Sequence, residues 1–303
     1  MLREHTIPNY CNLCHSKRFT ILYTICDNST NTPIKFNLVK CGSCGLLYVN
    51  PKPANVSMFY SEEEYGFYQP TIKNQNKYRK LSFLKLINRT LIKFTFGKNI
   101  FLSDRPGKKL LDIGCATGNY LSLMKTRGWK VKGIEPSKKA CQIGKKTGLD
   151  IINSDLQNAK INDTFDLITM RHVIEHFEDP FSELKKINKL LVKNGILIIA
   201  TPNVSSWEFK LFNKNWGAFE VPRHLFLFNK QTLSKLLRKT GFKVIDIKKE
   251  IYPASSLIGI NKMFPRITFI TKSRIFFWAF AIFYSIISRL IGNGRMIVIA
   301  KKF

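Results

Sequence analysis

The stretch LLDIGCATGNYL, residues 110–121, places a glycine-rich turn between an apolar strand and a helix. Gly114 and Gly118 allow the backbone to approach a ligand closely, and the first turn of the helix offers free N–H groups. The glycine spacing is not the GxGxxG of dinucleotide-binding folds, and the stretch lacks the Gly-Lys-Ser/Thr of a phosphate-binding P-loop. It therefore predicts a ligand-binding turn of another kind.

Strand and helix patterns alternate on both sides of this turn. The apolar patterns predict strands at 109–113, 130–134, 150–153, 165–170, 196–200, 242–247 and 296–300, and helices at 120–126, 138–146, 180–192 and 231–238. Asp179 followed by Pro180 is typical of a helix start, and Gly195 is expected to end that helix in a left-handed conformation. The alternation predicts an α/β fold whose parallel sheet is covered on both faces.

The turn resembles the first motif of class I S-adenosylmethionine-dependent methyltransferases, which is an acidic residue followed by three glycines two apart. Here the series is Asp112, Gly114, Ala116 and Gly118, so alanine stands where the middle glycine is usual. Alanine is small, and the departure does not count heavily against the match. The resemblance implies that these four residues bind S-adenosylmethionine.

Two further acidic residues extend the resemblance. Glu135 ends the second strand, where such enzymes bind the ribose hydroxyls, and a carboxylate can accept hydrogen bonds from two hydroxyls at once. Asp155, just past the third strand, matches the acidic residue that contacts adenine. The resemblance covers 106–250 and 293–303 and implies a Rossmann-like, seven-stranded sheet with an antiparallel last strand. A dehydrogenase or an inactive domain on the same fold is the alternative.

The string RHVIEHF, residues 171–177, matches the HxxEH pattern of one class of zinc protease. It follows the fourth strand, however, and ligands of open α/β sheets bind beyond the carboxyl ends of the strands. Methyltransferases of this type carry a similar string there, which makes His172 or His176 a candidate general base. Alternatively, His176 packs against the next helix and His172 lies against the cofactor without chemistry. A divalent metal on His172, Glu175 and His176, as in quinone O-methyltransferases, is a third hypothesis.

The string PRHLFLF, residues 222–228, is similar to one seen in bacterial glycan and quinone methyltransferases. It makes His224 a further candidate base, unless His224 only ties its loop to Asn203 or to a backbone carbonyl. The aromatic residues of this loop favour a lid and core over a platform for nucleobases.

Cysteines at the start of the chain stand in two CxxC pairs, Cys11 with Cys14 and Cys41 with Cys44. Four thiolates at this spacing predict a closed structural zinc site, and no structural disulfide is expected. Residues 1–50 are therefore interpreted as a small zinc-ribbon-like module. Residues 51–105, with a helical pattern through Leu81, are interpreted as a helical connector or cap.

Residues 251–292 form an apolar, basic insertion before the last strand. The run 275–288 is apolar or nearly so over 14 residues, below the roughly 18 needed to cross a bilayer. Lys272, Arg274 and Arg289 flank the run, and residues 251–303 contain eight basic residues and no acidic one. This pattern suits a helix at an anionic membrane surface, or a buried helix that shapes the acceptor pocket.

The chain of 303 residues has 49 Lys+Arg, 20 Asp+Glu and a net charge of +29, and 45% of its residues are hydrophobic, which excludes a disordered chain. No secretory signal opens it, so the expected location is cytoplasmic, with peripheral contact at the inner membrane face as an option. The overall plan resembles methyltransferases of bacterial polysaccharide biosynthesis, which implies a sugar or glycan hydroxyl as acceptor. An RNA methyltransferase, a quinone or small-molecule O-methyltransferase and a non-catalytic adaptor are the rivals. Nucleic acid is less favoured because the base-methylating NPPY tetrapeptide is absent, and the oligomeric state is left open.

Overall fold

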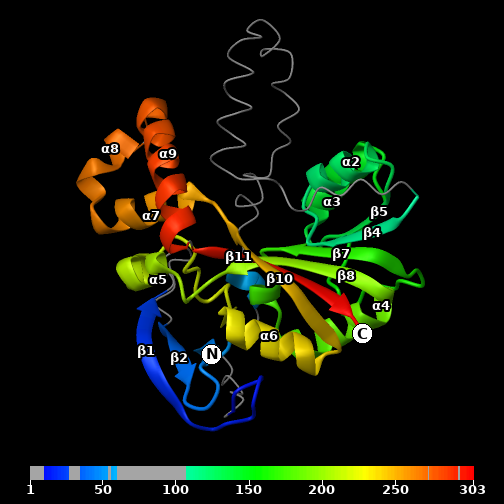
Figure 1. Cartoon of the computed structure of the whole chain (residues 1–303), viewed down its shortest axis with the longest axis horizontal. Helices are drawn as coiled ribbons and strands as arrows, with labels where there is room; N and C mark the ends of the chain where they lie inside the picture. Colours follow the sequence, from blue (N-terminus) through cyan, green and yellow to red (C-terminus); the bar gives the residue numbers. More distant parts are fainter. Residues whose placement is uncertain (1–9, 27–34, 54–55, 60–106, 272, 293) are drawn as a thin grey trace, which may run out of the picture.

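A seven-stranded sheet forms the centre of the computed structural model (Figure 1), which describes residues 10–26, 35–53, 56–59, 107–271, 273–292 and 294–303. Its strand order is β10-β11-β8-β7-β4-β5-β6. The strands are β4 (Lys109–Ile113), β5 (Lys130–Ile134), β6 (Ile151–Ile152), β7 (Phe165–Arg171), β8 (Leu191–Pro202), β10 (Phe242–Glu250) and β11 (Arg295–Lys302). Strands β4 to β8 run parallel, and β11 runs antiparallel to both of its neighbours. The predicted α/β sheet and its antiparallel last strand are confirmed.

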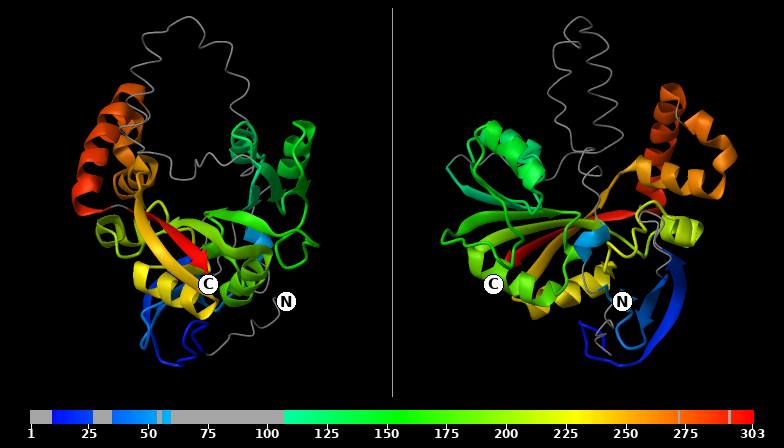
Figure 2. Two further views of the ribbon diagram at one scale, coloured as in Figure 1. Left: turned by 45° about the vertical axis from the view of Figure 1, so that its right-hand side comes forward. Right: turned by 180° about the vertical axis from the view of Figure 1, so that it is seen from behind.

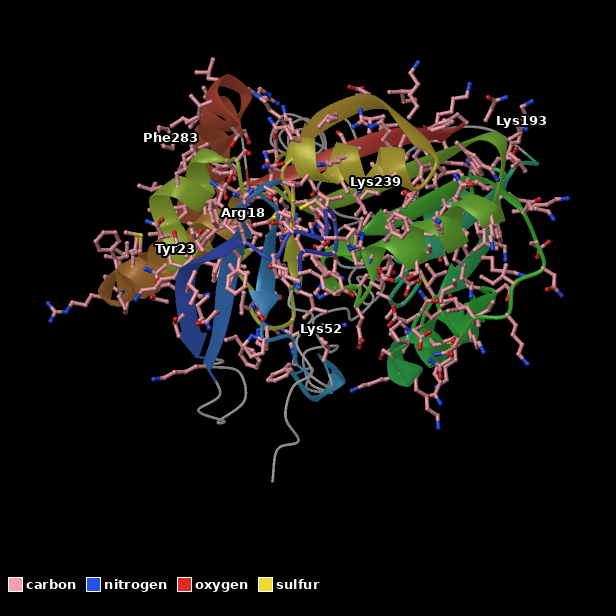
Figure 3. All side chains as sticks on the ribbon, turned by 90° about the horizontal axis from the view of Figure 1, so that it is seen from below. Arg18, Tyr23, Lys52, Lys193, Lys239 and Phe283 are labelled. Atoms are coloured by element: carbon pink, nitrogen blue, oxygen red, sulfur yellow. The ribbon has the colours of Figure 1, made fainter. Side chains whose placement is uncertain are left out.

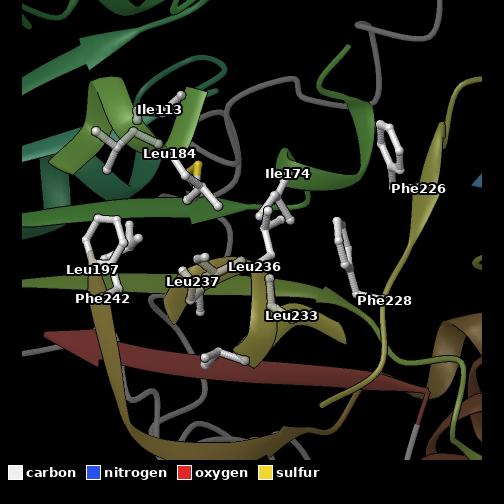
Figure 4. Packing of buried hydrophobic residues seen from close by; sticks show 14 of the residues in the cluster. Ile113, Ile174, Leu184, Leu197, Phe226, Phe228, Leu233, Leu236, Leu237 and Phe242 are labelled. Carbon is white, nitrogen blue, oxygen red and sulfur yellow. The ribbon is translucent and has the colours of Figure 1, made fainter. Parts of the chain in front are cut away.

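Helices cover both faces of this sheet because its buried strands are apolar on both sides. On one face α4 (Pro180–Leu190) and α6 (Lys230–Lys239) pack against side chains such as Ile113 and Leu197 (Figure 4). On the other face α2 (Asn119–Lys125) and α3 (Lys138–Lys146) pack against side chains such as Leu167 and Ile198. Successive residues of one strand thus belong to different hydrophobic clusters, because side chains alternate between the two faces of a sheet.

The turn between α4 and β8 differs from its prediction. Asp179 caps α4 by accepting a hydrogen bond from the Phe181 N–H at 3.1 Å, as expected. The helix ends at Leu190, however, and the left-handed residue is Asn194 rather than Gly195. Strand β8 begins at once, and a Cβ atom at Gly195 would lie 2.9 Å from the Val192 carbonyl oxygen. Glycine is needed there for close packing, not for a positive φ.

The N-terminal residues form a second, four-stranded antiparallel sheet. Strands β1 (Phe19–Cys26), β2 (Lys35–Cys41) and β3 (Leu47–Asn50) are joined by β9 (Phe226–Leu227), a two-residue strand of the PRHLFLF loop. The Lys239 ammonium of α6 also donates to the Leu13 carbonyl at 2.9 Å. The cysteine-bearing sheet is therefore fastened to the loop that carries His224.

Short elements connect these two sheets. A 3-10 turn, η1 (Val56–Phe59), follows β3. The predicted helical connector, 51–105, lies outside the described residues from position 60 onward, including Leu81. Beyond β7 comes η4 (Ile174–His176), and beyond β8 come α5 (Trp207–Phe212) and η5 (Asn213–Asn215).

The insertion before β11 folds into α7 (Pro253–Met263), η6 (Pro265–Ile267), α8 (Thr268–Thr271) and α9 (Arg274–Ile291). These helices stand apart from both faces of the central sheet in all three ribbon views (Figures 1 and 2). Within the described ranges, no single helix combines the length and the apolar character that crossing a bilayer requires. A sharply bent pair, 265–271 with 276–291, meets that criterion only when its two parts are taken together.

Candidate functional site

The glycine-rich turn between β4 and α2 adopts an unusual backbone. Gly114, Ala116 and Gly118 have φ values of 68°, 49° and 78°. A Cβ atom at Gly114 would lie 2.5 Å from Val173 Cγ2, and one at Gly118 would lie 2.3 Å from Leu149 Cδ1. The positive φ favours glycine at both positions, and a larger residue would also displace the neighbouring side chain. Ala116 adopts the same left-handed region at a cost of about 1 kcal/mol, which is the price of replacing the usual middle glycine.

Glu135 holds this turn directly. Its buried carboxylate accepts hydrogen bonds from the Ala116 N–H at 2.8 Å and from the Ser137 N–H at 2.9 Å. Burial raises the pKa of Glu135, and the two N–H donors oppose that rise. The structure thus brings the predicted ribose-binding residue against the predicted cofactor loop.

Asp155 lies at the same edge of the sheet but is exposed. Its carboxylate accepts from the backbone N–H and the side-chain amide of Asn158, at 2.7 and 2.8 Å. Desolvation raises its pKa and these hydrogen bonds lower it, with a net decrease. Asp155 shapes the turn after β6, and its predicted contact with adenine remains a prediction.

Asp112 is buried between two strands. It accepts from the Thr169 hydroxyl at 2.6 Å and lies 3.4 Å from Arg171 Nη2, while the Arg171 guanidinium lies 4.4 Å from the centre of the Tyr120 ring. Burial raises the pKa of Asp112, and the Arg171 charge opposes that rise. The Asp112 side chain therefore joins the ends of β4 and β7 and orders the residues that follow them.

His172 follows β7 with a φ of 56°, a conformation that is rare for a residue with a side chain. Its Nδ1 lies 3.3 Å from Glu175 Oε1, and its Nε2 lies 3.0 Å from Arg295 Nη1 and 3.4 Å from Glu250 Oε2. Desolvation and the Arg295 charge lower the pKa of His172, but the hydrogen bonds to Glu175 and Glu250 outweigh them, so the pKa is raised. Val173, the next residue, packs beside Gly114.

Glu250 and Arg295 were not predicted as site residues. They end β10 and begin β11, and the antiparallel register of these strands pairs them directly. The ring of Tyr252 lies 3.7 Å from the Arg295 guanidinium. The only sign of these two residues in the sequence is that opposite charges stand at the end of one predicted strand and the start of another. Their contact depends on the register of the two strands, which the fold shows.

His176 and His224 form a separate pair. Their rings meet edge to face with centroids 4.6 Å apart. Nδ1 of His176 lies 3.0 Å from the Arg223 carbonyl oxygen, and Nδ1 of His224 lies 3.0 Å from the Ala218 carbonyl oxygen. Burial and the charge of His224 lower the pKa of His176 to about 4. His224 thus bonds to a carbonyl, one of its two predicted alternatives, and not to Asn203.

Glu175 connects these two regions. It is fully buried, and its second oxygen accepts from the Thr201 hydroxyl at 2.9 Å. Desolvation raises its pKa, but the neighbouring histidines lower it to about 2. Ligand atoms of Glu175, His176 and His224 lie within 4.8 Å of one another, a spacing that a divalent cation could bridge. This grouping contains His224 in place of the His172 of the metal hypothesis.

The four N-terminal cysteines converge on one point. Their sulfur atoms lie within 4.8 Å of one another, with Cys11 to Cys44 at 3.6 Å and Cys14 to Cys41 at 3.5 Å. A tetrahedral ion with sulfur ligands at about 2.3 Å requires sulfurs about 3.8 Å apart. The spacing fits zinc, and it is far longer than the roughly 2.05 Å of a disulfide.

Both CxxC turns have the same backbone conformation and hydrogen-bond pattern. The His15 N–H donates to the Cys11 carbonyl at 2.7 Å, and the Gly45 N–H donates to the Cys41 carbonyl at 3.0 Å. His15 and Gly45 both have positive φ values, of 59° and 74°. Two matching turns thus present their four sulfurs to a common centre.

The profile of a methyltransferase domain family matches residues 79–247, more than half of the chain. The chain belongs to this family. It is an S-adenosylmethionine-dependent methyltransferase, as the motifs predicted. The positive-φ turn at Gly114–Gly118 and the Glu135 carboxylate meet at the carboxyl ends of β4 and β5, where open α/β sheets bind their ligands, so these residues are the ones that could hold the family's cofactor.

Curated relatives of this methyltransferase include enzymes of ubiquinone biosynthesis. A ubiquinone biosynthesis O-methyltransferase of Pelagibacter ubique is 30% identical over 53% of this chain and 77% of its own length. A mitochondrial one of Schizosaccharomyces pombe is 31% identical over 31% of this chain and 38% of its own length.

Solved structures share the fold at low identity. A chain from the complex between the Haloferax volcanii Trm112 methyltransferase activator and a methyltransferase has a TM-score of 0.50 and 15% identity, covering 72% of this chain and 95% of that one. A methyltransferase of Mesorhizobium loti has a TM-score of 0.45 and 16% identity, covering 67% and 94%.

Proposed function

We propose that this methyltransferase acts on a hydroxyl oxygen and that His172 is its general base. The observation that carries the proposal is the hydrogen bond between His172 Nδ1 and the buried Glu175, at the carboxyl edge of the sheet beside the glycine-rich turn. A carboxylate that accepts from Nδ1 fixes the tautomer whose Nε2 can take a proton.

S-adenosylmethionine, when bound, supplies a methyl group on a positively charged sulfur. The cofactor would lie against the turn at 114–118 and the first turn of α2, with Glu135 placed toward its ribose. His172 Nε2 takes the proton of the acceptor hydroxyl, in the place where it now accepts from Arg295. Glu175 and Glu250 stabilise the imidazolium that results, and close positioning contributes much of the rate.

Two acceptor classes have specific support. The names of the curated relatives favour the hydroxyl of a quinone-type small molecule. The overall plan, in which a four-cysteine module precedes the methyltransferase domain, resembles glycan-biosynthesis enzymes and favours a sugar hydroxyl of a nucleotide-linked, lipid-linked or polymeric glycan. Both are O-methylations, and both are compatible with a histidine base.

The acceptor class is tested by methyl transfer from radiolabelled S-adenosylmethionine into a host extract. The extract is separated into quinones and other lipids, nucleotide sugars, polysaccharide and RNA. Label in the quinone or glycan fractions supports hydroxyl methylation and selects between the two classes. Label in RNA, or on a nitrogen or carbon atom, contradicts it.

We further propose that the four thiolates of the N-terminal module hold a structural zinc ion. The ion would fix the strand pairing of β3 with β9 and so the loop of His224. Elemental analysis is expected to find about one zinc per chain, and none after Cys41→Ser. Cys141→Ser, which changes a buried cysteine beside the central sheet, is the matched control and should retain the metal. A parent protein without zinc would refute this site.

A further inference from the structure

Helix α9 is built with its polar side inward. Ala281, Tyr284, Ser285 and Ser288 lie on its buried side, one or two turns apart. The opposite side exposes Phe283, Ile286 and Leu290, with Phe283 60% and Leu290 77% accessible. A helix of a water-soluble surface has the reverse arrangement, with its apolar stripe facing the core.

The neighbouring helices of the insertion also expose large apolar side chains. Ten of the eighteen exposed large hydrophobic side chains of the described residues fall within 252–291. Those on α7, α8 and the turn between them are Ile258, Met263, Phe264, Phe269 and Ile270. A concentration of this kind marks an interaction surface.

The charge of the segment is entirely positive. Residues 251–303 contain no Asp or Glu, and Arg266 on η6 and Arg289 on α9 are exposed within the apolar surface. A second copy of this chain would bring like charges together at a symmetric contact. Anionic lipid headgroups would instead neutralise the arginines while the acyl boundary accepts the apolar side chains.

We propose that the outer face of α7, α8 and α9 docks on an anionic bilayer surface. The helices would lie in the interface, since within the described residues no single helix is long and apolar enough to cross. Phe283 and Lys193 lie at opposite ends of the molecule (Figure 3), so docking leaves the far end of the sheet in water.

The docking face is fastened to the candidate site at both of its ends. The insertion leaves β10 at Glu250 and returns to β11 at Arg295, and these are the two residues that contact His172. Glu208 locks the return by accepting from the Tyr284 hydroxyl of α9 and from the Gly294 N–H. If the proposed function holds, a lipid-attached acceptor would reach His172 from the bilayer without leaving it.

The test is flotation of the full chain with vesicles of phosphatidylcholine, with and without phosphatidylglycerol. We expect binding to the anionic vesicles only, weakened by salt. Phe283→Ser with Leu290→Ser is expected to lower the partition coefficient about 10- to 100-fold, because two apolar side chains no longer enter the interface. Arg266→Glu is expected to lower it about tenfold.

Matched controls separate docking from folding. Phe303→Ser removes an equally exposed side chain from the C-terminus, and Lys193→Glu reverses a charge at the far end; both should leave binding unchanged. Calorimetric S-adenosylmethionine binding checks that each variant is folded and keeps the docking result separate from any failure of methyl transfer. No vesicle binding, equal binding to neutral vesicles, or a lipid-free dimer dissociated by the double variant would overturn the proposal.

Discussion

The candidate histidines fall into two regions that differ in chemistry, although His172 and His176 are only four positions apart in the chain. His172 faces two carboxylates and an arginine, and its pKa is raised. His176 and His224 face each other and backbone carbonyls, and the pKa of His176 falls to about 4. Residue type alone does not identify a base, because neighbouring charge and burial decide whether an imidazole accepts a proton near neutral pH.

The largest expected effect is that of His172→Asn. Asparagine tolerates the left-handed backbone at this position, so the fold should remain, while the proton acceptor is lost. We expect kcat to fall by about 10²- to 10⁴-fold with unchanged affinity for S-adenosylmethionine. Steady-state kinetics and calorimetry measure the two quantities. A kcat within threefold of the parent would assign the base elsewhere.

Glu175→Gln should have the next largest effect. The change keeps the shape but removes the charge that orients His172 Nδ1. Replacing the orienting carboxylate of a serine protease triad lowers kcat by about 10⁴, and the second carboxylate here, Glu250, should limit the loss to about 100-fold. The control is Glu183→Gln, which changes a buried glutamate of α4 and should leave kcat unchanged. Equal losses in both variants would point to a folding defect.

The pH dependence separates the two regions more finely. A base must be neutral, so kcat/KM should rise as the pH increases through the raised pKa of His172, above its usual 6.5. Glu175, with a pKa near 2, and His176, with one near 4, cannot produce this limb. In Glu175→Gln the limb should move to lower pH, because a group that raises the pKa is gone. If the limb does not move, Glu175 does not influence the pKa of the group that titrates.

Much of this site was predictable from the sequence, and the remainder depended on strand pairing. The turn at Gly114 and the carboxylate at Glu135 lie within one strand–helix–strand unit, where local spacing fixes their positions. Glu250 and Arg295 are brought together by antiparallel pairing across the whole α7–α9 insertion. The pairing of β3 with β9 involves only two residues of the second strand, too few to form a pattern.

The smallest effect on activity is expected for His224→Phe. The change leaves the Ala218 carbonyl without its buried hydrogen-bond partner, at a cost of about 1–3 kcal/mol in the free energy of unfolding, while kcat should change only a few-fold. Urea denaturation measures the first quantity and steady-state kinetics the second. A loss of kcat as large as that of His172→Asn would show that His224 also takes part in catalysis and that the two regions act together.

The pair of His176 and His224 also predicts how the free energy of unfolding depends on pH. The pKa of His176 is about 4 in the folded chain and about 6.5 when unfolded, so the unfolded state binds more protons between these values. Stability from this residue is therefore present above pH 6.5 and is lost as the pH falls toward 4. His176→Gln should flatten that part of the stability curve, whereas His172→Asn, whose pKa shift has the opposite sign, should not. An unchanged slope in His176→Gln would show that the buried pair does not resist protonation, and the contrast with His172 would fail.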